Sequence, residues 1–283
     1  GVTLLVCLGG LVGNGTILWL LIHIHNIPIN SYFKNLALTN LIFSLFMAIS
    51  SLLYMIENAS CSAILPTLYL SFLSYLSLLS CNTGLYFLTA ISIEMCVSIS
   101  FLFWSPCCRR KHFSAMVSVL LGIASIAVFA VVISLCSFHE PKHCRMALIS
   151  MYVLNFLIFV LPMVISNIKL FIEFRRCSQQ HRLRRLYIVI FITVLFFLTF
   201  ALPLSIWNFQ QQFSYTEVPL KVVFLLACIN SSINPFICFL VGSSWRRCSV
   251  VSLQVAFRRV FDQPEDNTAR SNDIAMDTVA SAC

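Results

Sequence analysis

Length, composition and charge place this chain inside a membrane. Of its 283 residues, 59% are hydrophobic and only 10% are charged, which is less than half of the roughly 25% that soluble domains carry. The net charge of +8 comes from basic residues packed into short connections, so a nucleic-acid surface, which needs them on one folded face, is excluded.

Seven apolar segments are long enough to cross a bilayer, which takes about 20 helical residues. In chain order they are Val2–Ile22, Leu36–Ile56, Leu65–Phe103, Ser114–Cys136, Met146–Leu170, Leu186–Phe209 and Pro219–Val241. The third is longer than one bilayer thickness, so we expect it to tilt and to project into the cytoplasm. The sequence therefore predicts an all-α membrane protein, with a seven-transmembrane helix bundle over residues 1–242.

The distribution of basic residues sets the orientation of this bundle. The first, third and fifth connections and the tail hold fifteen Lys and Arg residues, whereas the other connections hold only Lys142, Arg145 and Lys221. Because short cytoplasmic loops carry the excess of positive charge, we expect the amino terminus outside and the tail inside. Gly1 lies at the edge of the first span, so we expect that no signal peptide is present and that an extracellular segment is missing.

The segment after the seventh span is predicted to lie on the membrane. Residues 243–261 form an expected amphipathic interfacial helix with four arginines, whose apolar positions are Trp245, Val250, Leu253, Phe257 and Phe261. Cys248 is a candidate palmitoylation site, with a plain interfacial thiol as the alternative. Residues 262–283 are acidic and polar, which is typical of a disordered cytoplasmic tail.

The chemistry-bearing side chains favour neither an enzyme nor a transporter. The six histidines all lie in or beside connections: His23, His25, His112, His139, His143 and His181. An intramembrane hydrolase would need an imidazole or metal ligands at depth, so we expect no enzyme, no cofactor and no metal site. Glu94, the candidate coupling group of a transporter, falls near the cytoplasmic end of the third span rather than at the midplane.

Two cysteines and one asparagine on the outer side are candidates for covalent modification. Cys136 and Cys144 flank the short connection between the fourth and fifth spans on the oxidising face, so we predict a disulfide between them. Cys61, in the first outer connection, has no obvious partner. Of three Asn-x-Ser/Thr matches, only Asn58 lies in an outer loop, and it is the candidate glycosylation site.

Local motifs in this order resemble the rhodopsin-like G protein-coupled receptors. That class's helix-one Asn, its helix-five and helix-six prolines and its helix-seven Asn-Pro match Gly13-Asn14-Gly15, Pro162, Leu202-Pro203 and Asn230–Pro235. The runs 82–92, 186–190 and 239–244 are similar to those of the Mas-related receptors, in particular the Mas-type members. The Cys136–Cys144 pair also resembles that family. The resemblance covers nearly the whole chain and implies a multi-pass receptor at the plasma membrane.

Polar residues and prolines inside the spans have physical consequences of their own. An unpaired amide at depth is costly, so Asn14 and Asn234 should bond to one another, to Asn40 or to backbone carbonyls. Three prolines each remove a backbone hydrogen bond and offer hinges for an outward swing of the cytoplasmic helix ends: Pro162, Pro203 and Pro235. The alternative is that these residues only set helix packing.

Four positions depart from the family pattern. Asn40 replaces the helix-two Asp, which predicts that sodium modulation is absent, since a neutral amide cannot compensate the ion as a carboxylate can. Met95, next to Glu94, replaces the Arg at the foot of helix three and has no donor. Gly122 replaces the helix-four Trp, and Cys238 replaces the Tyr of Asn-Pro-x-x-Tyr.

The ligand class stays open between a peptide and a small molecule. Six candidate pocket residues share outer-half positions: Tyr75, Tyr152, Asn155, Trp207, Gln210 and Gln211. They could equally face lipid or a neighbouring helix. Where family members that accept basic ligands carry acids, this chain has Val132 and Ile149. The outer acids Glu57, Glu140 and Glu217 are expected to be solvated loop charges.

The sequence thus predicts a receptor that passes an extracellular signal to a heterotrimeric G protein, with arrestin and membrane lipid as further partners. A ligand would shift the population toward a conformer with a cytoplasmic cleft lined by Met95, Arg109, Arg175 and Arg185. The expected switch and coupling residues are Asn14, Asn40, Glu94, Met95, Pro203, Asn234, Pro235 and Cys238. The first alternative is a receptor-like protein that binds or heteromerises without coupling. A transporter or channel follows, and an intramembrane enzyme ranks last.

Overall fold

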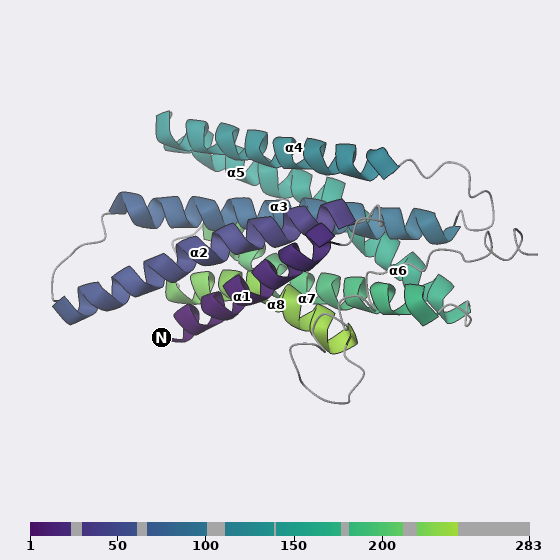
Figure 1. Cartoon of the computed structure of the whole chain (residues 1–283). Helices are drawn as coiled ribbons and strands as arrows, with labels where there is room; N and C mark the ends of the chain where they lie inside the picture. The colour runs from purple at the N-terminus through teal and green to yellow at the C-terminus, as the bar shows by residue number, and fades with distance from the viewer. Residues whose placement is uncertain are drawn as a thin grey trace, which may run out of the picture.

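The computed structural model describes residues 1–23, 30–60, 67–100, 111–138, 140–176, 181–211 and 220–242. Figure 1 shows these residues as a bundle of helices with no strand among them. In chain order the helices are α1 (Val2–His23), α2 (Asn30–Ser60), α3 (Thr67–Ser100), α4 (Lys111–Phe138), α5 (Pro141–Asn155), η3 (Phe156–Val160), α6 (Leu161–Arg176), α7 (His181–Gln211) and α8 (Leu220–Gly242).

These helices form the seven predicted spans, because α5, η3 and α6 follow one another without a break. Five stretches in α1 to α6 are long and apolar enough to cross a membrane, and shorter apolar stretches, Leu186–Ala201 and Phe224–Phe239, occupy α7 and α8. Several helices extend beyond the predicted apolar segments. For example, α2 begins at Asn30 rather than Leu36, because a helix can continue through the polar interface once its apolar part is set.

The fifth span contains a π-helical turn that the sequence did not predict. Over Phe156–Val160 the backbone leaves α-helical register, and the Leu161 amide donates to the Phe156 carbonyl five residues earlier. Pro162 follows at once and has no amide hydrogen, so the regular ladder is already interrupted there. A π turn inserts an extra residue and rotates the preceding side chains relative to those that follow. The proline signalled a local break, and the break takes this form.

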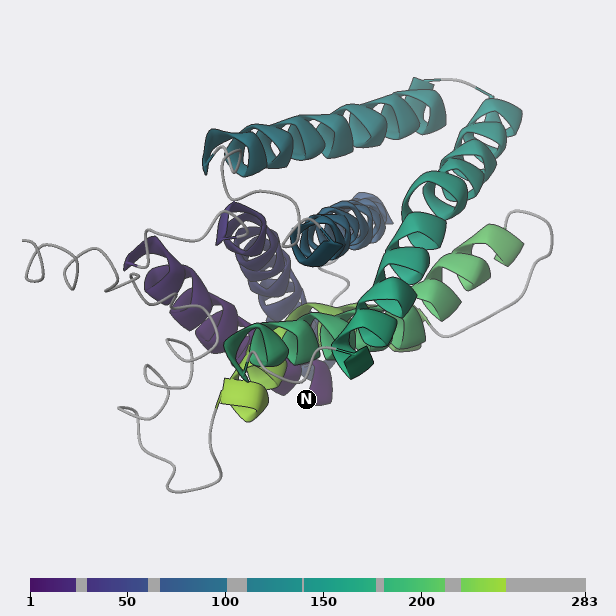
Figure 2. The ribbon, with the colours of Figure 1, turned by 90° about the vertical axis from the view of Figure 1, so that its right-hand side faces the viewer.

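The spans differ in how much of their surface lies inside the bundle. In α3 67% of the membrane-spanning stretch is buried, against 11% in α4. Figures 1 and 2 show α4 along one edge of the bundle, away from α1 and α8. One large apolar cluster joins the cytoplasmic halves of the helices, and a smaller one, which includes Cys7, Phe43, Met47 and Cys228, lies among α1, α2 and α8.

Candidate functional site

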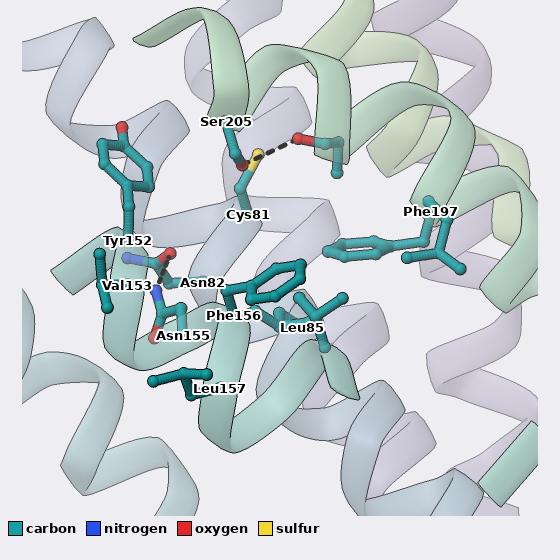
Figure 3. A pocket seen from close by; sticks show the side chains of 13 residues that line it. Cys81, Asn82, Leu85, Tyr152, Val153, Asn155, Phe156, Leu157, Phe197 and Ser205 are labelled. Atoms are coloured by element: carbon teal, nitrogen blue, oxygen red, sulfur yellow. Dashed lines mark hydrogen bonds between the residues drawn. The ribbon is translucent and has the colours of Figure 1, made fainter. Parts of the chain in front are cut away.

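A cavity of about 310 Å³ lies between α3, the α5–η3 segment and α7. Figure 3 shows side chains from all three elements pointing into it. It is lined by Cys81, Asn82, Leu85, Tyr152, Val153, Asn155, Phe156, Leu157, Val160, Phe197, Leu198, Ala201 and Ser205. The volume is at the lower end of the roughly 300–1,000 Å³ of small-molecule sites. None of the described lining residues carries a charge, so the cavity suits a small, largely apolar group with a few hydrogen bonds.

Asn82 and Asn155 line the cavity and belong to a chain of side-chain hydrogen bonds between α3 and α5. Tyr86 Oη donates to Asn155 Oδ1 at 2.9 Å, and Asn155 Nδ2 donates to Asn82 Oδ1 at 3.0 Å. Asn82 Nδ2 then meets Met151 Sδ at 3.2 Å. The Asn82–Asn155 bond is drawn in Figure 3. Because both amides are buried, each satisfies the other, and a ligand polar group could compete for the same bonds.

Further polar contacts continue this link toward the cytoplasm. Thr89 Oγ1 donates to the Phe159 carbonyl at 3.2 Å, and the Tyr86 ring stacks on Phe159 with 3.9 Å between centroids. Further along α3 toward the cytoplasm, Asn167 Nδ2 donates to Ser92 Oγ at 2.9 Å. Asn82, Tyr86, Thr89 and Ser92 recur every three or four residues, which places them on one face of α3. This face joins α3 to the fifth span over much of its length.

Two of the six predicted ligand residues line the cavity. Tyr152 and Asn155 do so, and Asn155 is buried while Tyr152 is partly exposed. Tyr75 is partly exposed on α3 but does not line this cavity. The side chains of Trp207, Gln210 and Gln211 lie outside the described residues, although their backbone belongs to α7.

Sequence reasoning missed Asn82, which lines the cavity, and Tyr86, which donates a hydrogen bond to the lining residue Asn155. Asn82 is an amide at membrane depth, and the same cost argument that singled out Asn14 applies to it. Tyr86 carried no comparable signal, because a tyrosine in an apolar helix can face lipid, interface or core. At the two positions where family members that accept basic ligands carry acids, Val132 is buried and Ile149 is partly buried. Glu140 is exposed, as expected of a loop charge.

Asn14 bonds to backbone carbonyls, one of the outcomes that the sequence left open. Its Nδ2 donates to the Gly10 carbonyl at 2.9 Å and to the Ser231 carbonyl of α8 at 3.0 Å. A Cβ on Gly13 would lie 2.6 Å from Pro235 Cβ, and one on Gly10 would meet Ser44 Oγ at 2.9 Å. The glycines therefore let α1 approach α8 and α2 closely enough for the Asn14 bond.

Asn40 and Asn234 share a small cavity with Asn14. Its described lining also includes Thr193 and Cys238, and its volume is about 10 Å³. Asn14 Oδ1 and Asn40 Nδ2 are buried without a hydrogen-bond partner among the described residues. The polar groups of the described lining are amides, a hydroxyl and a thiol, and none is a carboxylate. These residues therefore do not fit a sodium ion.

At the foot of α3 an apolar side chain occupies the position that the resemblance assigns to Arg. Met95 is 1% exposed and belongs to the same apolar cluster as Leu170 of α6, Tyr187 of α7 and Cys238 of α8. Glu94, beside it, is only partly buried, and its Oε2 accepts a hydrogen bond from Ser114 Oγ of α4 at 3.1 Å. At this position the cytoplasmic ends of the helices are therefore held together by apolar packing, without the ion pair that an Arg could form.

The predicted bridge between α4 and α5 is present, with Cys136 and Cys144 joined and their Cα atoms 4.3 Å apart. Pro235 is buried inside α8 and packs on Gly13. Pro203 lies within α7, but its side chain is outside the described residues, as are those of Arg175 and Arg185. Other predicted features also lie outside the described residues. They are the side chain of Asn58, residue Arg109, and the predicted interfacial helix with Cys248 and the tail that follows it.

Comparison with known proteins gives the family. No family model matches the chain. Proto-oncogene Mas of Rattus norvegicus is 33% identical over an alignment that covers 95% of this chain and 86% of that protein. The rat Mas-related G-protein coupled receptor member H is 33% identical over 96% of this chain and 86% of its own length. Member D of the same species is 34% identical over 92% and 85%. With this identity along nearly its entire length, the seven-span chain belongs to the Mas and Mas-related G protein-coupled receptors.

Proposed function

We propose that this plasma-membrane receptor binds its activating ligand in the α3–α5–α7 cavity and signals by movement of α7. Membership of the family gives a ligand and a heterotrimeric G protein as partners in general. The single observation that carries the site is the Asn82–Asn155 hydrogen bond, whose two side chains line a small-molecule-sized cavity and which continues through Tyr86 into the interior of the bundle. A ligand that alters these bonds changes how α3 and the fifth span are held together.

The packing of α7 supports it as the moving element. α7 packs extensively on α8 but makes few contacts with α5 and α6. In contrast, α3 and the fifth span are joined by several side-chain hydrogen bonds. A ligand that contacts Phe197, Ala201 or Ser205 of α7 on one side and α3 on the other can bias the position of α7 relative to that fixed pair.

Cys81 offers a test that needs no known ligand. It is an unbridged cysteine that lines the cavity, so a benzyl methanethiosulfonate reagent can attach an apolar group there. We expect labelling to change nucleotide exchange on a G protein at least twofold in either direction. Cys81→Ser should abolish that change, since no other thiol among the described residues lines the cavity. Stoichiometric labelling of Cys81 without any effect on exchange would contradict the proposed site.

The burial of Met95 favours one second candidate, a receptor-like protein that binds or heteromerises with little coupling. The family pattern has a guanidinium there, and Met95 cannot donate a hydrogen bond to a G protein. Expression of the chain in cells, followed by calcium, cAMP and arrestin readouts, separates the two candidates. A basal or stimulated response in any readout supports the coupling receptor. Silence in all of them supports the non-coupling one.

A further inference from the structure

A second hollow of about 640 Å³ lies between α3, α4 and η3. Tyr86, whose hydroxyl bonds to Asn155 of the ligand cavity, is one of its lining residues. Tyr86 and Phe159 form its deep wall, and Glu94 and Ser114 stand at its other end. It is lined by Tyr32, Tyr86, Thr89, Ala90, Ile93, Glu94, Val97, Ser98, Phe113, Ser114, Val117, Leu121, Ile158 and Phe159. We call this the α3–α4 groove. Its volume falls within the roughly 300–1,000 Å³ of ligand sites.

The groove is mostly apolar, and its cytoplasmic end holds a carboxylate. Glu94 Oε2 accepts a hydrogen bond from Ser114 Oγ at 3.1 Å, and the Tyr32 hydroxyl lies against the same two groups. Both neighbours are neutral. Among the described lining residues Glu94 is the one charged group, and none is Lys, Arg or His. Hydroxyl donors orient a carboxylate but do not neutralise it, so the groove favours a cation near Glu94.

The groove opens toward lipid rather than toward water on the outer side. Ile93, Phe113 and Ile158 line it and are 41%, 60% and 55% exposed, and in a spanning bundle such surfaces face the hydrocarbon. From Glu94 to Tyr86 it extends about 12 Å along α3 at the rise of an α-helix. Glu94 lies near the cytoplasmic end of α3, so the charged end is at the inner leaflet and the apolar end points to the bilayer centre.

We propose that the α3–α4 groove binds a membrane-dissolved amphiphile with one hydrocarbon chain and a protonated primary amine, with the amine on Glu94. The depth of the carboxylate and the apolar wall above it match the two ends of such a molecule. A neutral alcohol of equal length lacks the charge that Glu94 attracts, and a fatty acid is repelled by it. The proposal does not depend on the identity of the ligand in the α3–α5–α7 cavity.

The test uses the full chain in phosphatidylcholine nanodiscs and three photoactivatable sixteen-carbon probes: an amine, an alcohol and a carboxylic acid. Labelled peptides are located by mass spectrometry. We expect the amine to label segments 86–98 and 113–121 at concentrations at least tenfold lower than the alcohol, and the acid to label them least. Equal labelling by amine and alcohol, or labelling of the amine only elsewhere, would overturn the proposal.

Substitutions then assign the preference to Glu94. Glu94→Gln should bring the amine down to the level of the alcohol while the alcohol still labels the groove, which shows that the groove remains folded. Glu173→Gln, an acid near the cytoplasmic end of α6, should keep the tenfold preference. Ala90→Phe should block all three probes by filling the groove. If Glu94→Gln fails to fold, the amine-to-alcohol ratio of the unsubstituted receptor and its loss in Ala90→Phe decide the question. An amine preference that persists in a folded Glu94→Gln receptor would contradict the assignment.

Discussion

Two regions of the bundle are held together in different ways. In the α1–α8 seam, formed by Gly10, Gly13, Asn14, Ser232 and Pro235, backbones approach so closely that a Cβ on either glycine would collide with the facing helix. In contrast, α4 is tied to α5 by the Cys136–Cys144 bridge and to α2 and α3 by three serines that face inward, Ser114, Ser118 and Ser125, which bond to Glu94, Asn35 and Thr83. A Cβ on Gly122 of α4 would meet nothing within 4 Å.

The comparison teaches what replaces the hydrophobic effect between helices in a membrane. Lipid is as apolar as the α4 surface, so the exposed Leu120, Ile123 and Ile126 of α4 gain little by moving into the bundle. Close backbone packing and side-chain hydrogen bonds remain as the main sources of helix association. The α1–α8 seam has both, whereas α4 has mostly the second. Substitutions in the two regions should therefore change the stability of the receptor by different amounts and in different directions.

The largest effect is expected in the α1–α8 seam. Gly13→Ala places a methyl group 2.6 Å from Pro235 Cβ, and overpacking of this kind costs about 1–3 kcal/mol. Gly9→Ala and Gly15→Ala are matched controls, since their nearest atoms would be 3.9 and 3.7 Å away. Thermal unfolding, followed by the labelling of buried cysteines, should show a lower Tm for Gly13→Ala only. Equal Tm values for the three variants would remove the distinction between the regions.

The next effect concerns the link between α3 and the fifth span. Asn155→Leu leaves the Tyr86 hydroxyl and the side-chain oxygen Oδ1 of Asn82 without their partners. Such a loss costs about 1–3 kcal/mol when the groups are buried. Tyr86→Phe, which removes only one hydroxyl, should cost less. The double variant should cost less than the sum of the two, because the bond between them is lost only once. Strict additivity in thermal unfolding would show that the two side chains are not coupled.

The sequence predicted the number, the order and the approximate extent of the spans, because hydropathy and the Lys and Arg distribution respond directly to the bilayer. It also predicted the Cys136–Cys144 bridge, which the short outer connection favours. The π turn could not be predicted, since Pro162 indicates a missing hydrogen bond but not how the backbone compensates. Helix faces were equally hard to assign. The polar residues of α3 are spread around the helix rather than gathered on one face, so the pattern could not show that Asn82 rather than Tyr75 turns toward α5.

A smaller effect is expected where α4 meets α3. Thr83 Oγ1 and Ser125 Oγ lie 2.6 Å apart, and interhelical hydrogen bonds of this kind contribute about 0.6 kcal/mol on average and at most about 2 kcal/mol. Ser125→Ala should lower the Tm slightly, and Ser134→Ala, an exposed serine of the same helix, should leave it unchanged. A loss for Ser125→Ala as large as that of Gly13→Ala would mean that α4 is held as firmly as α1.

The smallest effect has the opposite sign. Gly122→Ala adds a methyl group into open space and removes a helix-interior glycine, which is worth up to about 1 kcal/mol. We expect a slightly higher Tm without change in cell-surface expression. A lower Tm would show that α4 packs against a neighbour at Gly122, which would contradict the loose attachment inferred from its exposure.

The central claim, that this Mas-related chain is a receptor which activates G proteins, is tested most directly by nucleotide exchange on the unliganded protein. The full chain in nanodiscs is combined with purified heterotrimers of each Gα class, and Met95→Arg is measured in parallel. We predict exchange above that of empty nanodiscs for at least one class, with a further increase in Met95→Arg. Exchange equal to that of empty nanodiscs for every class, in both proteins, would contradict the claim.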